Sequence, residues 1–105
     1  MWSDERDLIM KLFEENNEKY PRTCPCCGEK SGHIFMFKKQ ETDIFGSAWA
    51  WCSKCQEYSH SRYLIPEWWK NFESISLDEL HSRPDNLDEV NVGIDAWVNK
   101  IKNLE

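Results

Sequence analysis

Four cysteines in two closely spaced pairs are the residues of this chain whose spacing points most directly to chemistry. Cys24 and Cys27 are separated by two residues, as are Cys52 and Cys55, and 24 residues lie between the pairs. A Cys-x-x-Cys segment can turn both thiolates toward one point, and two such segments supply the four soft ligands of a closed tetrahedral zinc site. The spacing therefore predicts one structural Zn²⁺ per chain, held by these four cysteines.

Cys26 is a fifth cysteine, and pairing Cys24 with Cys26 is the alternative to the predicted first pair. Gly28 favours Cys27 as the ligand, because the residue after the second thiolate of a zinc knuckle adopts a positive φ and glycine does so without strain. His60 is a further candidate ligand if one pair is assigned wrongly. Since no secretory signal precedes the cysteines, we expect reduced thiols in a cytoplasmic protein rather than disulfides.

The segment Cys24-Pro25-Cys26-Cys27-Gly28 resembles the Cys-Pro-x-Cys-Gly knuckle of zinc ribbons, and the second pair resembles their second knuckle, over about residues 22–63. A shorter resemblance, limited to the same five residues, connects the chain with the bacterial cysteine-rich CPCC proteins. The second pair of the chain, in Trp51-Cys52-Ser53-Lys54-Cys55-Gln56, departs from that family. Zinc ribbons occur in transcription factors, ribosomal proteins, enzyme subdomains and interaction modules, so the resemblance implies a fold and a metal rather than an activity.

The length of 105 residues is typical of one domain, and a core this small gains from a metal. We predict an α+β fold in which residues 21–65 form a three-stranded antiparallel zinc ribbon. An N-terminal helix in residues 1–20 and a helical segment in residues 66–105 are expected to flank the ribbon. No apolar run approaches the length of a membrane span, so we expect no membrane partner.

The hydrophobic pattern predicts the elements that position the cysteines. An apolar stripe at helical spacing predicts a helix over about residues 4–18, with Ser3 as its N-cap. Alternating side chains predict strands over residues 33–39, 47–52 and 57–64. In the second of these strands, small alanines on one face leave room for close packing of a helix.

Three helices are predicted after the ribbon. Pro66 is expected to begin a short helix that carries three aromatic residues: Trp68, Trp69 and Phe72. The Ser76-Leu77-Asp78-Glu79 capping box predicts a second helix to about His81, followed by a loop over residues 83–86. An apolar stripe predicts the last helix over about residues 92–104.

The charge distribution disfavours nucleic acid as the partner. The net charge is −6, with six acidic and three basic side chains in residues 1–20 and nine and four in residues 67–105. Phosphate backbones are bound mainly by an excess of lysine and arginine. The alternative remains, because the ribbon places basic residues beside aromatic ones that could stack on single-stranded bases: Lys38, Lys39, Lys54 and Arg62 beside Phe35, Phe37, Trp49 and Trp51.

Enzymatic chemistry is not expected from this sequence. His33, His60 and His81 are the candidates for acid–base catalysis, but none has a partner at a recognisable spacing. Four thiolates close the metal shell, whereas a catalytic zinc keeps an open position. Neither cysteine pair lies at the helix start of a βαβ unit, which a redox function would favour.

The six tryptophans favour a protein partner, because tryptophan is enriched in binding hot spots. Neighbouring residues of a helix are about 100° apart, so Trp68 and Trp69 cannot both face the core, and we assign both as candidate partner-binding residues. We therefore predict a non-catalytic structural-zinc protein that binds a protein partner. A bacterial immunity or inhibitor-type protein against a basic toxin fits the acidic composition. The alternative is a zinc-ribbon protein that binds nucleic acid or assists transcription or translation.

Overall fold

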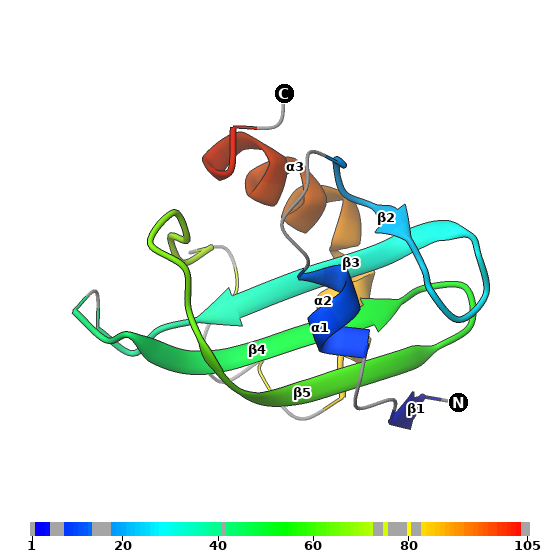
Figure 1. The fold of residues 1–105 in the computed structure, drawn as a ribbon, viewed down its shortest axis with the longest axis horizontal. Coiled ribbons are helices and arrows are strands. Elements are labelled where there is room, and N and C mark those ends of the chain that lie inside the picture. Colours follow the sequence, from blue (N-terminus) through cyan, green and yellow to red (C-terminus); the bar gives the residue numbers. More distant parts are fainter. Residues whose placement is uncertain are drawn as a thin grey trace.

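The computed structural model describes residues 2–4, 8–13, 18–40, 42–72, 75, 80 and 83–103. It is a mixed α+β fold in which α1 lies in front of a twisted sheet and α2 lies behind it (Figure 1). The elements in chain order are β1 (Ser3–Asp4), α1 (Leu8–Leu12), β2 (Arg22–Thr23), β3 (Lys30–Phe37), β4 (Phe45–Cys52), β5 (Glu57–Leu64), α2 (Asp85–Glu89) and α3 (Asn91–Ile101).

The sheet is built on the predicted antiparallel strands, with a short strand added at each edge. The strand order is β1-β5-β4-β3-β2, with β1 parallel to β5 and every other neighbouring pair antiparallel. The prediction of a three-stranded antiparallel ribbon is therefore wrong in detail, because the sheet has five strands and is mixed. Strands of two residues, such as β1 and β2, are too short to show an alternating pattern.

The limits of the central strands follow the sequence pattern closely. The prediction of a strand over residues 57–64 is confirmed by β5, which has the same bounds. β3 and β4 begin earlier than predicted, at Lys30 and Phe45. Because β3 begins at Lys30, it starts three residues after Cys27. The strand can therefore position the first pair of metal ligands.

One face of the sheet is covered by α1, which packs on the small residues of β4. Ala48 and Ala50 are fully buried there, in agreement with the predicted close approach of a helix. The helix buries three apolar side chains against the sheet: Leu8, Ile9 and Leu12. A Cβ at Gly32 would lie 2.6 Å from a methyl carbon of Leu12, so this approach depends on glycine in β3.

The N-terminal helix differs from its prediction. Ser3 donates its N–H to the carbonyl oxygen of Gln56 at 2.9 Å and belongs to β1, so it is not a helix N-cap. Backbone pairing with β5 therefore replaces the predicted start of the helix over residues 4–18. Residues 5–7 and 14–17 of that prediction lie outside the described residues.

The opposite face of the sheet carries large aromatic side chains. Phe35, Trp49 and Trp51 are buried there, and the ring of Trp69 meets that of Phe35 edge-to-face at 5.7 Å. α3 packs on β3 and buries two aliphatic side chains: Ile94 and Val98. The sheet therefore lies between two apolar layers, as the apolar residues on both faces of the predicted strands indicate.

No helix forms over residues 66–72, which is a correction to the predicted helix. The N–H of Trp69 donates to the carbonyl of Pro66 at 3.1 Å, which closes a single turn. The side-chain amide of Asn71 then accepts from the N–H of Lys38 at 3.0 Å and donates to its carbonyl at 2.7 Å. These bonds to the end of β3 replace the backbone bonds that a helix would make.

The C-terminal helices agree with the prediction only in part. The predicted helix over residues 92–104 is confirmed as α3, while residue 104 lies outside the described residues. α2 occupies part of the predicted loop over residues 83–86. The capping-box helix falls on residues 76–79 and 81, which are also outside the described part. Among the described residues, no helix is long and apolar enough to cross a membrane.

Trp69 is the tryptophan of the 66–72 segment that the fold depends on. It is 2% exposed, and its Nε1 donates to Asn71 at 3.2 Å. We expect Trp69→Ala to lower the free energy of unfolding by about 3–5 kcal/mol, the usual cost of deleting a large core aromatic, as measured by denaturant titration. Trp68→Ala, at a half-buried position, should cost clearly less. Equal losses in the two variants would contradict this assignment.

Candidate metal centre

The four predicted cysteines come together at one end of the sheet. The Sγ atoms of Cys24, Cys27, Cys52 and Cys55 all lie within 4.8 Å of one another. Cys24 Sγ is 3.8 Å from Cys55 Sγ, and Cys27 Sγ is 3.6 Å from Cys52 Sγ. A regular tetrahedron of thiolates at the usual zinc–sulfur distance of about 2.3 Å has sulfur–sulfur edges of about 3.8 Å. The cluster therefore has the size that one metal ion requires.

The two knuckles adopt the same backbone turn. The N–H of Gly28 donates to the carbonyl of Cys24 at 2.9 Å, and the N–H of Gln56 donates to that of Cys52 at 3.0 Å. Gly28 has a φ of 78° and Gln56 a φ of 60°. The predicted positive φ at Gly28 is confirmed, and in the second knuckle a glutamine accepts the same left-handed conformation.

Backbone N–H groups inside the turns point at the sulfurs. The N–H of Cys26 lies 3.3 Å from Cys24 Sγ, and the N–H of Cys55 lies 3.4 Å from Cys52 Sγ. Hydrogen bonds of this kind stabilise thiolates, which are the form that binds a metal. Each knuckle thus offers an anionic sulfur a partner before any metal binds.

Strand register brings the knuckles together. Gly32 of β3 lies opposite Cys52 of β4, so the first knuckle, which precedes β3, lies beside the second knuckle, which follows β4. The N–H of Ser53 donates to the carbonyl of Ser31 at 3.0 Å and extends this pairing into the second knuckle. The site therefore depends on the β3–β4 hairpin as well as on the cysteine spacing.

The thiols differ in their surroundings. Burial raises the pKa of the Cys52 thiol, but N–H groups of Cys55 and Lys54 and the hydroxyl of Ser31, 3.0 Å away, outweigh it and lower the pKa to about 7. Burial raises the pKa of the Cys55 thiol. A metal would displace the remaining protons from the thiols it binds, so its affinity should fall as the pH decreases.

The alternative ligands lie outside the cluster. Cys26 is exposed and does not belong to the group of converging sulfurs, and no cysteine among the described residues forms a disulfide. His60 stacks on Trp49 with ring centroids 4.4 Å apart, and burial lowers its pKa. The geometry therefore agrees with Cys24 and Cys27, rather than Cys24 and Cys26, as the first pair of ligands.

A buried polar cluster links the second knuckle to the C-terminal helices. Both carboxylate oxygens of Asp95 in α3 contact His33 Nδ1, at 2.8 and 2.9 Å. His33 Nε2 lies 2.7 Å from the Oγ of Ser53, which belongs to the second knuckle. Asp88 in α2 accepts from the hydroxyl of Ser53 and, at 3.0 Å, from Trp51 Nε1.

Ser53, His33 and Asp95 are ordered like a catalytic triad, but the hydrogen bonds run in the wrong direction. The single hydroxyl proton of Ser53 is donated to Asp88, so His33 Nε2 must donate to Ser53 Oγ. A catalytic triad requires the reverse, with the imidazole accepting the serine proton. Burial raises the pKa of the Asp95 carboxyl, and the hydrogen bond and charge of His33 oppose this effect. The cluster joins the second knuckle to α2 and α3.

Sequence analysis missed this link because Asp95 is 62 positions from His33. The available signal was an acidic residue beside Ile94 on the buried stripe of the last helix, where an unpaired charge would be costly.

Of the two proposed partner-binding tryptophans, Trp69 lies in the core and Trp68 is half-buried. The third candidate histidine, His81, is outside the described residues.

No family model matches the chain, and neither a curated protein nor a solved structure matches it. The function is therefore inferred from the cysteine cluster and from the apolar hollow described below.

Replacing a cysteine of the cluster should remove the metal and most of the folded structure. For Cys52→Ser we expect metal content to fall from one ion per chain to nearly none and cooperative unfolding to be lost, because a structural site contributes its binding energy to folding. Elemental analysis and circular dichroism measure the two effects.

Cys26→Ser is the matched control, since Cys26 is exposed and outside the cluster. It should keep both the metal and the unfolding transition. Metal loss in this variant, or a metal-free wild-type protein, would overturn the assignment of the ligands.

The His33–Asp95 pair should show strong energetic coupling. Removing one partner of a buried ion pair costs about 3–5 kcal/mol, so His33→Phe and Asp95→Leu should each destabilise the protein severely. The double variant should be less destabilised than the sum of the two, with a coupling energy of at least about 2 kcal/mol by denaturant titration. Additive losses would show that the pair does not stabilise the docking of α3.

Proposed function

We propose that the protein is a non-catalytic binding protein that holds one structural Zn²⁺ and recognises a protein partner. The observation that carries this proposal is the closed set of four sulfurs at tetrahedral spacing, contributed by Cys24, Cys27, Cys52 and Cys55. Four thiolates with this geometry are typical of structural zinc, and they leave no coordination position for a substrate.

The surroundings of two histidines support a role without catalysis. His33 is buried between Asp95 and Ser53, and His60 is stacked on Trp49. Both rings are therefore held by contacts within the fold. The metal site would have no open coordination position, and the described histidines contact other residues of the fold. These two features favour a binding protein over an enzyme.

Exposed apolar side chains support a protein partner. Ile44 is 65% exposed and Leu64 is 59% exposed, and they lie together at the rim of one hollow in the surface. Large apolar residues grouped at a concave site are typical of interaction surfaces. An acidic chain with net charge −6 suits a basic partner, which is what an immunity or inhibitor-type protein against a basic toxin would bind.

The nucleic-acid alternative loses three of its four stacking residues in the folded chain, while Phe37 is half-buried in the hollow that Lys39 and Arg62 also line. Phe35, Trp49 and Trp51 are buried, so their rings are not available to bases. Arg62 lies over the ring of Phe45 at 5.4 Å. Nucleic-acid binding therefore stays the alternative, and we expect a direct binding measurement to exclude it.

Capture of a partner should depend on the apolar rim. We expect the tagged, zinc-loaded protein to retain one specific protein from a cell lysate of its source organism, and Leu64→Asp to reduce this capture at least about tenfold by burying a charge in the interface. Val92→Asp is the matched control, because Val92 is 80% exposed on α3, away from this hollow. Quantitative mass spectrometry compares the three samples.

Nuclease treatment should leave the captured protein unchanged. Binding to mixed-sequence RNA or DNA should be weak and should not survive physiological salt, because few phosphates can be neutralised. Tight binding that falls steeply with salt and requires Lys38, Lys39 or Arg62 would replace the proposal by the alternative.

A further inference from the structure

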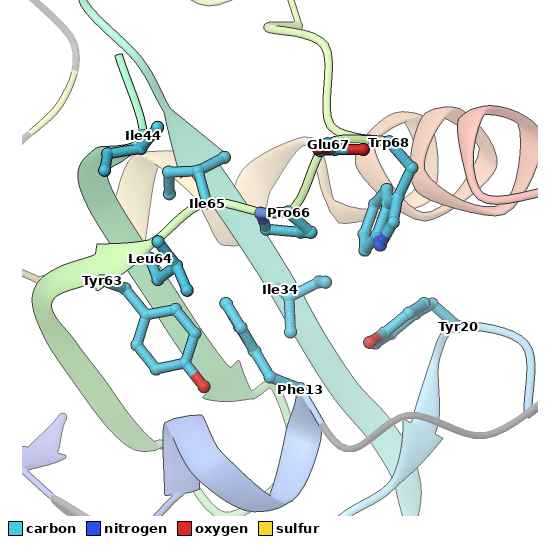
Figure 2. Close-up of a pocket in the computed structure, with 10 residues that line it drawn as sticks. All are labelled: Phe13, Tyr20, Ile34, Ile44, Tyr63, Leu64, Ile65, Pro66, Glu67 and Trp68. Atoms are coloured by element: carbon cyan, nitrogen blue, oxygen red, sulfur yellow. The ribbon is translucent and has the colours of Figure 1, made fainter.

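A deep apolar hollow lies on the α1 face of the sheet, beyond the end of that helix. Its volume is about 460 Å³, within the range of ligand-binding pockets. Figure 2 shows aromatic rings from separate parts of the chain around it, with aliphatic side chains between them. The four aromatic lining residues are Phe13, Tyr20, Tyr63 and Trp68.

The hollow follows from the pattern of side chains on this face. Ile34 in β3 and Tyr63 in β5 line it from the two strands that flank β4, and no residue of β4 belongs to the described lining. α1 ends at Leu12, and Phe13, the next residue, lies against Tyr63 with ring centroids 5.0 Å apart. The described residues on this side of the hollow therefore come from β3, β5 and the segment that follows α1.

Trp68 forms one wall of the hollow and carries an unused hydrogen-bond donor. Lys102 Nζ lies 5.3 Å from the centroid of the indole ring. The indole Nε1 is shielded from solvent and has no hydrogen-bond partner among the described residues. Figure 2 shows the nitrogen-bearing edge directed toward the space between Ile34 and Tyr20. A buried donor without a partner is costly, so a movement of this wall that brings an acceptor to Nε1 would be favoured.

The rim of the hollow is apolar and continues into a second one. Ile44 lines both the first hollow and an adjoining one of about 620 Å³, which Phe45 and Arg62 also line. Leu64 is exposed at the first rim. Two adjoining hollows that share an exposed isoleucine suit an extended chain better than one compact small molecule.

Charges near the two hollows differ. Glu67 is the one charged residue among the described residues that line the first hollow, and Figure 2 shows it at the outer edge. Lys39, Asp43 and Arg62 line the second hollow. Glu67 therefore offers a cation a partner at the first hollow, and the net charge of −6 adds attraction for a basic partner.

We propose that the first hollow binds an apolar side chain from an extended segment of a basic protein partner. In this proposal, Trp68 Nε1 donates to a backbone carbonyl of the segment, and Glu67 pairs with a lysine or arginine next to the apolar residue. This rests on the proposed function and specifies its partner. It also reverses the expected roles, because this chain supplies the pocket and the partner supplies the inserted side chain.

Synthetic peptides test the proposal directly. The zinc-loaded, isotope-labelled protein is titrated with acetylated and amidated Gly-Lys-Phe-Lys-Gly, and the indole N–H resonances are followed by NMR. We expect the Trp68 indole resonance to shift and saturate at millimolar peptide. Replacing the phenylalanine by alanine, or both lysines by glutamate, should weaken binding at least about tenfold.

Two pairs of variants separate the two contacts. Trp68→Phe keeps an aromatic wall but removes the N–H, so we expect at least about fivefold weaker binding, read from the remaining shifted amides. Trp97→Phe is its control, since Trp97 Nε1 donates to the carbonyl of Lys70 at 2.9 Å, outside the hollow. Glu67→Lys should reverse the preference toward the glutamate peptide, whereas Glu89→Lys, the same charge change on α2, should not.

Several outcomes would overturn this inference. One is that no peptide shifts the resonances near Trp68. Another is that phenethylamine, which has no peptide carbonyl, binds as tightly as the phenylalanine peptide. A third is that the protein associates with itself through this hollow. In each case the lysate experiment still tests the proposed function independently, because a partner could be captured through another surface. Loss of lysate capture with retained peptide binding would instead contradict the proposed function alone.

Discussion

The convergence of two cysteine knuckles at one end of the β3–β4 hairpin is the constraint on which the rest of this fold depends. Cys52 ends β4 and lies opposite Gly32, so the strand register and the sulfur cluster require each other. A small domain has a limited hydrophobic core, and a metal held by the four cysteines would add its binding free energy to folding. Ser53 extends the effect, because it lies within the second knuckle and also bonds to His33 and Asp88. Sheet, metal site and C-terminal helices thereby form one connected unit.

The alternation of large and small side chains along β4 determines how the two layers differ. Trp49 and Trp51 fill the face toward α2 and α3, whereas Ala48 and Ala50 allow α1 to approach the other face. The apolar hollow lies on the same face as α1 and is lined there by Phe13, Ile34 and Tyr63.

The charged and polar groups of the fold are used in two distinct ways. His33 and Asp95 are buried and satisfy each other, so they stabilise the docking of α3. Trp68 is the contrasting case, since its Nε1 is shielded from solvent but has no partner among the described residues. Satisfied buried groups indicate structure, while an unsatisfied donor beside a hollow indicates a ligand. This contrast is the reason for proposing the hollow, and not the polar cluster, as the interaction site.

What the sequence alone determined is the part that depends on local spacing. Two Cys-x-x-Cys segments with Gly28 specify the ligands, and strict alternation specifies β5, because both signals lie within a few neighbouring residues. Only the tertiary structure decided which segments pair at a distance. Ser3 joins the sheet by donating its N–H to the carbonyl of Gln56. The 66–72 segment forms no helix, because its side chains bond to the end of β3 and fill the core. These contacts join residues far apart in the chain, and no local pattern specifies them.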